Sequence, residues 1–149
     1  MSVNTCELRP ARTGDLPAVV ALLESCGLPT GDLNETMLIS FCIAELEGEV
    51  VAVAGLEAFG TVGLLRSLAV AEDRRGSGLA EWLVERCEAD AYRRGVEAVY
   101  LLTTTAADYF RRRGYADVPR DAVPTAVAGH AQFRSLCPAS ARCLAKPLA

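Results

Sequence analysis

The chain has 149 residues, of which 51% are hydrophobic, and a formal net charge of −4. The length predicts one domain over residues 1–149 with a sizeable core, and the acidic balance argues against nonspecific nucleic-acid binding, which needs a basic surface. No apolar run reaches the length of a membrane span, and no basic leader precedes an apolar run near the N-terminus, so we expect a cytoplasmic protein.

The N-terminal part of the sequence predicts a strand followed by a helix. Residues 7–11 are typical of a short strand, and Pro10 places it at a sheet edge or a strand end. Apolar side chains then recur at helical spacing from residue 16 to residue 26, and Gly27 ends the pattern. The polar segment around residues 34–37 predicts a short helix or a mobile loop at the side of a pocket.

Three further strands follow with short turns between them, which predicts an antiparallel meander. The first strand covers residues 41–46, the second runs from residue 50 to near Phe59, where Gly60 ends it, and the third covers residues 62–70. Glu47-Gly48-Glu49 forms the first turn. Because the second strand is almost wholly apolar, we expect both of its faces to be covered.

The rest of the chain predicts helix, strand, helix and strand. A helix runs from residue 79 to about residue 92 and leads into a strand over residues 98–104. This strand should be parallel to the strand over residues 62–70, because a helix connects the two. The remaining elements are a short helix over 106–113, a helical turn near 126–135 and a last strand over 141–146. The fold class is therefore α+β with a mixed sheet.

The stretch from residue 64 to residue 84 combines an apolar strand, a glycine-rich turn and an amphipathic helix. Gly76 and Gly78 precede the helix, whose first main-chain N–H groups have no partner within it and carry partial positive charge. A phosphate or pyrophosphate can approach these groups because the glycines have no Cβ atoms. The spacing fits neither a P-loop, since Leu79 follows Gly78, nor a dinucleotide fingerprint, since Glu81 stands where a small residue is needed.

The pattern Arg75-x-x-Gly78-x-Ala80, directly after a strand that ends in Leu68-Ala69-Val70, resembles the signature of the GCN5-related N-acetyltransferase (GNAT) family. The predicted order of elements also resembles that family along most of the chain. The resemblance implies a mixed sheet splayed between two parallel strands, helices on both faces, and acetyl-coenzyme A (acetyl-CoA) as cosubstrate in the gap. Carried over position by position, the cofactor-binding residues are Leu68, Ala69, Val70, Arg75, Gly76, Ser77, Gly78, Leu79, Ala80, Thr104, Ala107, Phe110 and Arg113.

The resemblance further implies direct attack of a neutral amine on the thioester, which needs a base for the amine proton and a donor for the oxyanion. The main-chain N–H of Leu68 is the candidate donor, because a splayed strand leaves an amide unpaired. Glu57 is the candidate base, because it lies at the end of an apolar strand, where partial desolvation would suit it to proton transfer. The alternative interpretation of Glu57 is an exposed charge at a strand end.

One residue departs from the family pattern. Many members carry a tyrosine that protonates the coenzyme A thiolate, four residues before the Gly-Phe/Tyr that ends the short helix. Gly114 fixes that position as Phe110, which has no proton to give, and the adjacent Tyr109 is turned about a quarter turn away along a helix. A thiol with a pKa of about 8.5 is a fair leaving group without assistance. We interpret Arg111 and Arg112 as a solvated helix end.

The acceptor is expected to be a small-molecule amine. Arg66 lies within an apolar strand, where an unpaired charge is costly. We therefore expect its guanidinium to form a two-pronged ion pair, either with a substrate carboxylate or with a structural acid such as Glu57. Ser67 and Thr103 are the other candidate substrate-binding residues.

Two segments resemble narrower groups within the family. Residues 101–115 resemble the acetyltransferase domain of N-acetylglutamate synthases, and residues 135–143 resemble single-domain acetyltransferases linked to arsenic resistance. These resemblances imply a glutamate-like acceptor, including phosphinothricin and arsinothricin.

Several alternatives are left open. In the first, the protein is an acetyltransferase that acts on a different amine, such as an antibiotic, a polyamine or a protein N-terminus. In the second, it is a non-catalytic sensor that binds acetyl-CoA or a metalloid, which the missing tyrosine at Phe110 supports best. In the third, it is a protein-interaction module that binds no cofactor. Neither nucleic acid nor membrane is an expected partner, and edge strands that need covering favour a homodimer.

The six cysteines predict free thiols. No two are spaced as Cys-x-x-Cys and the one histidine is His130, so no metal site is expected. We interpret Cys137 and Cys143 as packing residues of the last strand, with a site for trivalent arsenic as the alternative.

Overall fold

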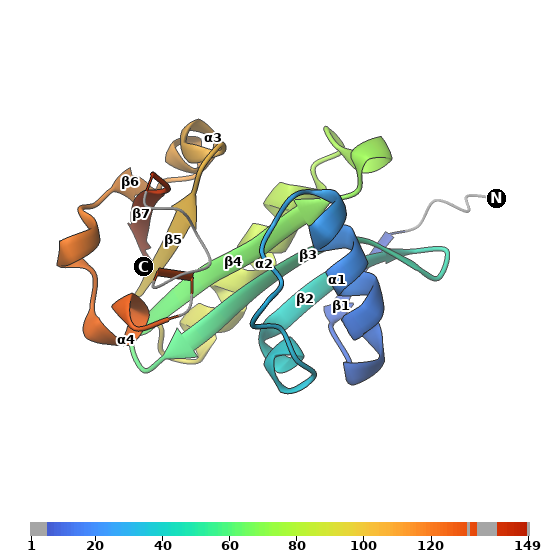
Figure 1. Cartoon of the computed structure of the whole chain (residues 1–149), viewed down its shortest axis with the longest axis horizontal. Helices are drawn as coiled ribbons and strands as arrows, with labels where there is room; N and C mark the ends of the chain where they lie inside the picture. The colour runs from blue at the N-terminus through green and yellow to red at the C-terminus, as the bar shows by residue number, and fades with distance from the viewer. Residues whose placement is uncertain (1–5, 131, 134–139, 149) are drawn as a thin grey trace.

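A seven-stranded sheet forms the centre of the fold, in the order β1-β2-β3-β4-β5-β7-β6 (Figure 1). The computed structural model describes residues 6–130, 132–133 and 140–148. The strands are β1 (Cys6–Pro10), β2 (Phe41–Leu46), β3 (Glu49–Phe59), β4 (Val62–Val70), β5 (Ala98–Thr103), β6 (Ala116–Asp117) and β7 (Arg142–Pro147). The helices are α1 (Leu16–Ser25), α2 (Leu79–Arg93), α3 (Ala107–Arg112) and α4 (Thr125–Ala128), with a 3₁₀ turn η2 (Thr36–Ser40) before β2.

The sheet is antiparallel except where β4 meets β5. The chain passes through β2, β3 and β4 as a meander, with β1 added at the edge. Three successive pairs, from Val62↔Ala98 to Leu64↔Tyr100, join β4 to β5 in parallel, and α2 is the crossover between them. The last strand, β7, returns antiparallel between β5 and β6. These pairings confirm the predicted meander and the predicted parallel pair.

Two helices cover opposite faces of the sheet (Figure 1). The buried stripe of α2 packs against the inner strands and consists of Leu79, Leu83, Val84, Cys87 and Ala91. On the other face α1 buries Val19 and Leu23 against β3 and β4. Because both helices pack against it, β3 is buried from Val51 to Leu56, as its apolar sequence predicts. No helix in the described part of the chain has both the length and the apolar character needed to cross a membrane.

A bulge interrupts β4 where a charged residue enters the sheet. Val53 opposes Ala69 and Gly55 opposes Arg66, so one residue of β3 faces both Ser67 and Leu68. Ser67 has a φ of 58°, in the left-handed region that non-glycine residues seldom adopt. Bulges of this kind bend a strand and redirect its side chains, and they are common beside active sites.

Gly55 brings an aromatic ring close to the main chain of β3. A Cβ atom at this position would lie 2.6 Å from Cε1 and 2.7 Å from Cζ of Phe41. The guanidinium carbon of Arg66 in turn lies 5.9 Å from the centroid of the Phe41 ring, at cation–π distance. The missing side chain at residue 55 therefore allows Phe41 to support Arg66.

β3 ends at Phe59, as Gly60 predicts, and its last residue pairs with Val62 of β4. Other elements differ from expectation. The two-residue strand β6 is too short to leave a periodic signal in the sequence. α4 spans only part of the predicted turn, and residues 131 and 134–135 of that turn lie outside the described residues.

We predict that Gly55→Ala lowers the free energy of unfolding by about 1–3 kcal/mol, because the added methyl group overlaps the Phe41 ring in a closely packed core. Urea denaturation measures the change. Gly14→Ala is the matched control, since a Cβ at Gly14 meets nothing within 4 Å, and it should not lower stability. Equal denaturation midpoints for Gly55→Ala and the wild type would show that Phe41 does not lie against residue 55.

Candidate functional site

β4 and β5 separate beyond their short pairing, and a cavity opens between them. The last parallel pair is Leu64↔Tyr100, although β4 continues to Val70 and β5 to Thr103. The cavity has a volume of about 390 Å³. Its lining comes from both strands, the loop after α1, the start of α3 and the chain near β7: Gly27, Leu28, Pro29, Leu65, Arg66, Ser67, Leu68, Leu101, Leu102, Thr103, Thr104, Thr105, Ala106, Phe110, Gln132 and Ala141.

The edge of β4 that faces β5 lacks a strand partner from Leu65 to Val70, among the described residues. The bulge at Ser67 and Leu68 lies within this stretch. Main-chain N–H and C=O groups without a partner need one, so an extended ligand in the cavity can pair with them. This is the stretch, Leu68 to Val70, that the family resemblance implies for the cosubstrate.

The glycine turn at the start of α2 is built to accept an anion. Gly76 and Gly78 have φ angles of 79° and 86°, and a Cβ atom at either one would meet nothing within 4 Å. Gly78 is the N-cap residue and has no side chain to satisfy the first N–H groups of α2. A hollow of about 310 Å³ lies over the turn, lined by Val70, Arg74, Arg75, Gly76, Gly78, Leu79, Ala80, Glu81 and Tyr109. These residues fit the pyrophosphate of a coenzyme A.

The side chain of Arg75 lies across the end of β4. Its Nε donates to the Val70 carbonyl oxygen at 3.2 Å, and its Nη2 contacts the Cys26 sulfur at 3.4 Å. Arg75 is exposed, so these contacts can be exchanged for a phosphate. Ser77 donates its hydroxyl to the Arg74 carbonyl oxygen, which tightens the turn.

A fully buried arginine lies on the α1 face of the sheet, beside the cavity. The side chain of Arg66 has 0% relative exposure. Both Nη atoms bind the carboxylate of Asp32, with Nη2–Oδ1 at 2.6 Å, and Nη1 also donates to Glu57 Oε2 at 3.2 Å. Nε donates to the Ser67 hydroxyl at 3.1 Å. Two carboxylates therefore surround a single guanidinium, which leaves an excess of negative charge.

Glu57 accepts its hydrogen bonds on one oxygen. His130 Nε2 lies 2.8 Å from Oε2, the same atom that Arg66 approaches. The other ring nitrogen of His130, Nδ1, accepts from the Gln132 main-chain N–H at 3.0 Å, so the ring presents an N–H at Nε2. Oε1 of Glu57 remains available to a ligand, since the hydrogen bonds that the described residues make to Glu57 fall on Oε2.

The electrostatics of Glu57 differ from the sequence-based expectation. Partial desolvation does raise its pKa, as expected for the end of an apolar strand. The hydrogen bonds from His130 and Arg66, together with the charge of Arg66, outweigh burial, and the pKa of Glu57 is lowered overall. The carboxylate is therefore ionised at neutral pH, and its pKa is not raised as its place at the end of an apolar strand led us to expect. Glu57 is half-buried, not an exposed charge at a strand end.

The neighbours Tyr109 and Phe110 point to different cavities. Phe110 is buried, packs edge-to-face on Tyr115 and lines the cavity between β4 and β5. Tyr109 lines the hollow over the glycine turn, and its buried hydroxyl has no hydrogen-bond partner among the described residues. Burial raises the pKa of Tyr109, which keeps the phenol protonated. The helical offset predicted from the sequence is thus present, with the phenol at the turn rather than in the cavity.

The remaining predicted residues of the β5–α3 wall make local contacts. Thr103 Oγ1 accepts from the Ala106 N–H at 2.9 Å, and Thr104 is exposed at the cavity. Ala107 packs against the α2-side core instead of lining the cavity. Arg113 Nη1 lies 3.1 Å from Glu81 Oε2 of α2, next to the turn.

Other basic and thiol groups have structural partners. Arg111 pairs with Asp108 and Asp117, in agreement with its interpretation as a helix end. Cys143 is buried in β7, and burial raises the pKa of its thiol to about 11. Cys137 lies outside the described residues. The described part of the chain contains no group of three or more His, Cys, Asp or Glu side chains that could bind a metal ion.

Sequence reasoning missed two members of the buried cluster. Asp32 falls in a polar turn whose composition resembles any solvated loop, and His130 is the single histidine of the chain. The available signal was the buried guanidinium of Arg66, whose five N–H donors need more acceptors than Glu57 alone supplies.

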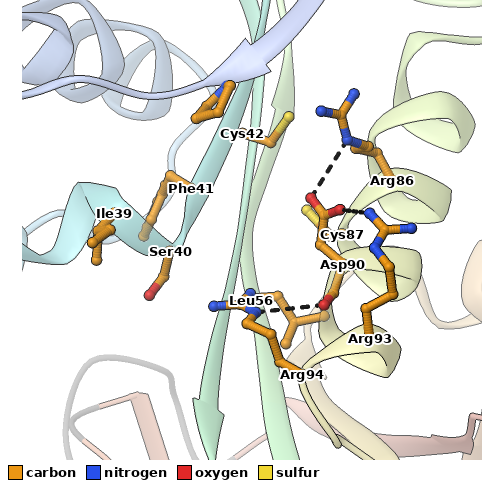
Figure 2. Close-up of a pocket in the computed structure, with 11 residues that line it drawn as sticks. Ile39, Ser40, Phe41, Cys42, Leu56, Arg86, Cys87, Asp90, Arg93 and Arg94 are labelled. Atoms are coloured by element: carbon orange, nitrogen blue, oxygen red, sulfur yellow. Dashed lines mark hydrogen bonds and ion pairs between the residues drawn. The ribbon is translucent and has the colours of Figure 1, made fainter.

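A second hollow, of about 290 Å³, lies at the C-terminal end of α2, away from the cavity (Figure 2). Figure 2 shows Arg86, Arg93 and Arg94 gathered around Asp90. Arg86 Nε lies 3.4 Å from the Asp90 carboxylate, and Arg94 Nε donates to the Asp90 carbonyl oxygen at 3.4 Å. Basic side chains in a last helical turn are stabilised by the helix dipole. This hollow shares no lining residue with the cavity or with the hollow over the glycine turn. We therefore interpret its arginines as stabilising the end of α2 and not as part of the candidate site.

Comparison with known proteins gives relatives in one family. The model of the acetyltransferase (GNAT) family matches residues 15–115. An uncharacterized N-acetyltransferase from Chlorobaculum tepidum is 31% identical over 131 residues, which cover 83% of each protein. The amino-acid acetyltransferase of Pseudomonas putida is 32% identical over 120 residues, which cover 77% of this chain and 28% of that protein. The chain thus spans little more than a quarter of the length of such amino-acid acetyltransferases.

Solved structures share the fold. N-acetylglutamate synthase from Neisseria gonorrhoeae, in complex with coenzyme A and N-acetyl-glutamate, has a TM-score of 0.85 at 24% identity and covers 97% of this chain and 35% of that chain. A Mycobacterium tuberculosis protein in complex with coenzyme A has a TM-score of 0.81 at 23% identity and covers 96% of this chain and 99% of that chain. The fold and the family implied by the glycine turn are confirmed: the chain belongs to the acetyltransferase (GNAT) family and is an N-acetyltransferase.

Proposed function

We propose that the protein transfers the acetyl group of acetyl-CoA to the α-amine of a small amino acid. The observation that carries this proposal is the arrangement along β4: the hollow over the glycine turn lies at the end of the strand, and a separate cavity, with the buried Arg66 cluster beside it, lies along its middle. The names of the relatives, amino-acid acetyltransferases, support an amino acid as acceptor. Support also comes from the complex of N-acetylglutamate synthase with N-acetyl-glutamate.

The cosubstrate is expected to lie along β4. The unpaired main chain of Leu68, Ala69 and Val70 would bind its extended arm, and the turn from Arg75 to Ala80 would bind its pyrophosphate. The wall formed by Thr104 and Phe110, with Ala107 and Arg113 behind it, would face it from the other side. Bound acetyl-CoA supplies a thioester, whose carbonyl carbon is open to attack by an amine.

Proton transfer and charge stabilisation then fall to two groups of this chain. Glu57 Oε1 accepts the proton of the ammonium group, directly or through a water, while His130 and Arg66 stabilise the carboxylate through Oε2. The N–H of Leu68, at the bulge and on the unpaired edge of β4, donates to the developing oxyanion. Phe110 gives no proton to the leaving thiolate, which departs unassisted.

The acceptor's carboxylate is proposed to bind at Arg66, with Ser67 and Thr103 at the side of the cavity. Glutamate, phosphinothricin and arsinothricin all combine an α-amino acid with an acidic side chain, so they are the first acceptors to test. A role in arsenic resistance rests on the tail over residues 135–143, of which 135–139 lie outside the described residues.

A cationic amine is the second candidate acceptor. Asp32 and Glu57 together carry one more negative charge than Arg66 offsets, and such a site attracts ammonium groups. Acetylation of polyamines in preference to amino acids would favour this candidate.

We predict that Gly78→Ala weakens the binding of coenzyme A by about tenfold or more, because a methyl group would stand over the main-chain N–H groups of the turn. Isothermal titration calorimetry with coenzyme A measures this affinity. Gly48→Ala is the matched control: Gly48 has a φ of 82° and equally open surroundings, but it lies in the β2–β3 turn. If both variants bind coenzyme A as the wild type does, the turn is not the pyrophosphate site.

We predict that Glu57→Gln lowers kcat with the best amino-acid acceptor by about 100-fold at neutral pH, because the proton acceptor is lost while the shape is kept. Because the pKa of Glu57 is lowered from 4.5, Glu57 is already ionised at neutral pH. The rise of kcat/KM above neutral pH should therefore follow the deprotonation of the acceptor's ammonium group. Glu45→Gln is the control for the loss of a half-buried carboxylate: Glu45 lies on β2 and pairs with Arg9. It should leave kcat unchanged. Turnover near the wild-type rate in Glu57→Gln would exclude Glu57 as the base.

A further inference from the structure

The hydrogen-bonding capacity of Arg66 is nearly used up within the protein. Ser67 takes the Nε hydrogen, Asp32 and Glu57 take the two hydrogens of Nη1, and Asp32 takes one of Nη2. The two-pronged face of the guanidinium, formed by Nη1 and Nη2, is therefore occupied by the Asp32 carboxylate. A second carboxylate cannot bind that face in the same way while Asp32 is there.

Asp32 is chemically equivalent to the group that the acceptor would bring. Both are carboxylates, so exchanging one for the other leaves the charge around Arg66 unchanged. The pKa of Asp32 is lowered by Arg66 despite partial burial, so its side chain is ionised when it is released at neutral pH. Its side chain retains 17% exposure, whereas Arg66 is closed off. Asp32 is thus the more accessible member of the pair, and it lies beside the cavity that Arg66 lines rather than in its wall.

The segment that carries Asp32 is suited to a local movement. It connects α1 to η2, and its residues Gly27, Leu28 and Pro29 form part of the cavity wall. Leu28 N–H donates to the Leu23 carbonyl oxygen at 3.0 Å, and Leu33 N–H donates to the Thr30 carbonyl oxygen at 3.0 Å. These hydrogen bonds stay within the segment or reach α1, while the Arg66 pair ties the segment to the sheet.

We propose that Asp32 is the specificity-determining residue of the acceptor site: it occupies the Arg66 face as an internal carboxylate that only a carboxylate-bearing acceptor displaces. This inference rests on the proposed function and names the acceptor class more closely. An amine without a carboxylate that moved Asp32 would take away the acceptor of both Nη atoms and leave Arg66 with Glu57 as its one carboxylate partner among the described residues, which is costly for a buried cation. Neutral and cationic amines are thereby rejected, although the cluster carries excess negative charge.

The proposal predicts tighter binding when the internal competitor is weakened. Asp32→Asn keeps the size of the side chain but removes its charge, so a larger fraction of the protein has Arg66 open to a ligand. Because apparent affinity scales with that fraction, the Kd for L-glutamate in the presence of coenzyme A should fall by about fivefold or more. The diamide of L-glutamic acid, which has the same amine and no carboxylate, should bind poorly to both proteins.

Asp15→Asn is the matched control. Asp15 binds both Nη atoms of Arg9 at 2.8 and 2.9 Å, and its side chain is 14% exposed. It therefore loses the same kind of ion pair at a similar depth but outside the cavity, and it should leave the affinity for L-glutamate unchanged. Urea denaturation of both variants separates a loss of stability from a change in affinity.

Calorimetry and product analysis together distinguish this inference from the proposed function. Tighter binding of L-glutamate by Asp32→Asn supports the inference, even if no acetylated product forms and the proposed function fails. Turnover of L-glutamate with equal or weaker binding in Asp32→Asn overturns the inference and leaves the proposed function intact. Equal affinity of the wild type for glutamate and its diamide, or binding of neither by any variant, overturns the inference.

Discussion

A guanidinium with no solvent exposure is the constraint on which the acceptor side of this structure depends. An unpaired charge in such a position is costly, so Arg66 needs partners from every direction. Asp32 comes from the loop after α1, Glu57 from β3, and Ser67 from the bulge in β4 itself. The ring of Phe41 covers the cluster, which Gly55 permits. One buried charge therefore fixes the position of a loop, a bulge and a carboxylate.

The separation of β4 from β5 is the second constraint, and it links the cluster to the glycine turn. Pairing for only three residues leaves most of β4 with an open edge on the side of the cavity. The same strand carries Arg66 near its middle and leads into the turn at its end. Acceptor and cosubstrate can therefore meet along one strand, and a single bulge sets both the direction of the Arg66 side chain and the position of the Leu68 amide.

Local patterns in the sequence were sufficient for the fold and for the geometry of the glycine turn. The order of strands and helices follows from apolar periodicity, and the parallel pairing follows from the intervening helix α2. The turn from Arg75 to Ala80 is contiguous, so its glycines and the helix start that follows can be recognised together. The offset between Tyr109 and Phe110 was also predictable, since it depends only on helical geometry.

The buried cluster was only partly predictable, because its members are distant in sequence. Arg66 lies 9 residues from Glu57 and 34 from Asp32, and Glu57 lies 73 residues from His130. Glu57 was singled out by its place at the end of an apolar strand, and it was one of two partners expected for the buried charge of Arg66, beside a substrate carboxylate. Asp32 and His130 reach the cluster through the folding of a loop and of the chain after α4, which no local pattern encodes. For the same reason the net direction of the Glu57 pKa could not be derived from its own strand.

Product identification tests the central claim most directly. Purified protein, acetyl-CoA and an equimolar mixture of L-glutamate, phosphinothricin, spermidine and an aminoglycoside would be incubated and analysed by liquid chromatography with mass spectrometry. The account predicts that N-acetylated products form from the acceptors that carry an α-amino acid group, and that spermidine and the aminoglycoside remain unmodified. Acetylated spermidine or aminoglycoside without an acetylated amino acid would contradict the claim that the Arg66 cluster receives a carboxylate.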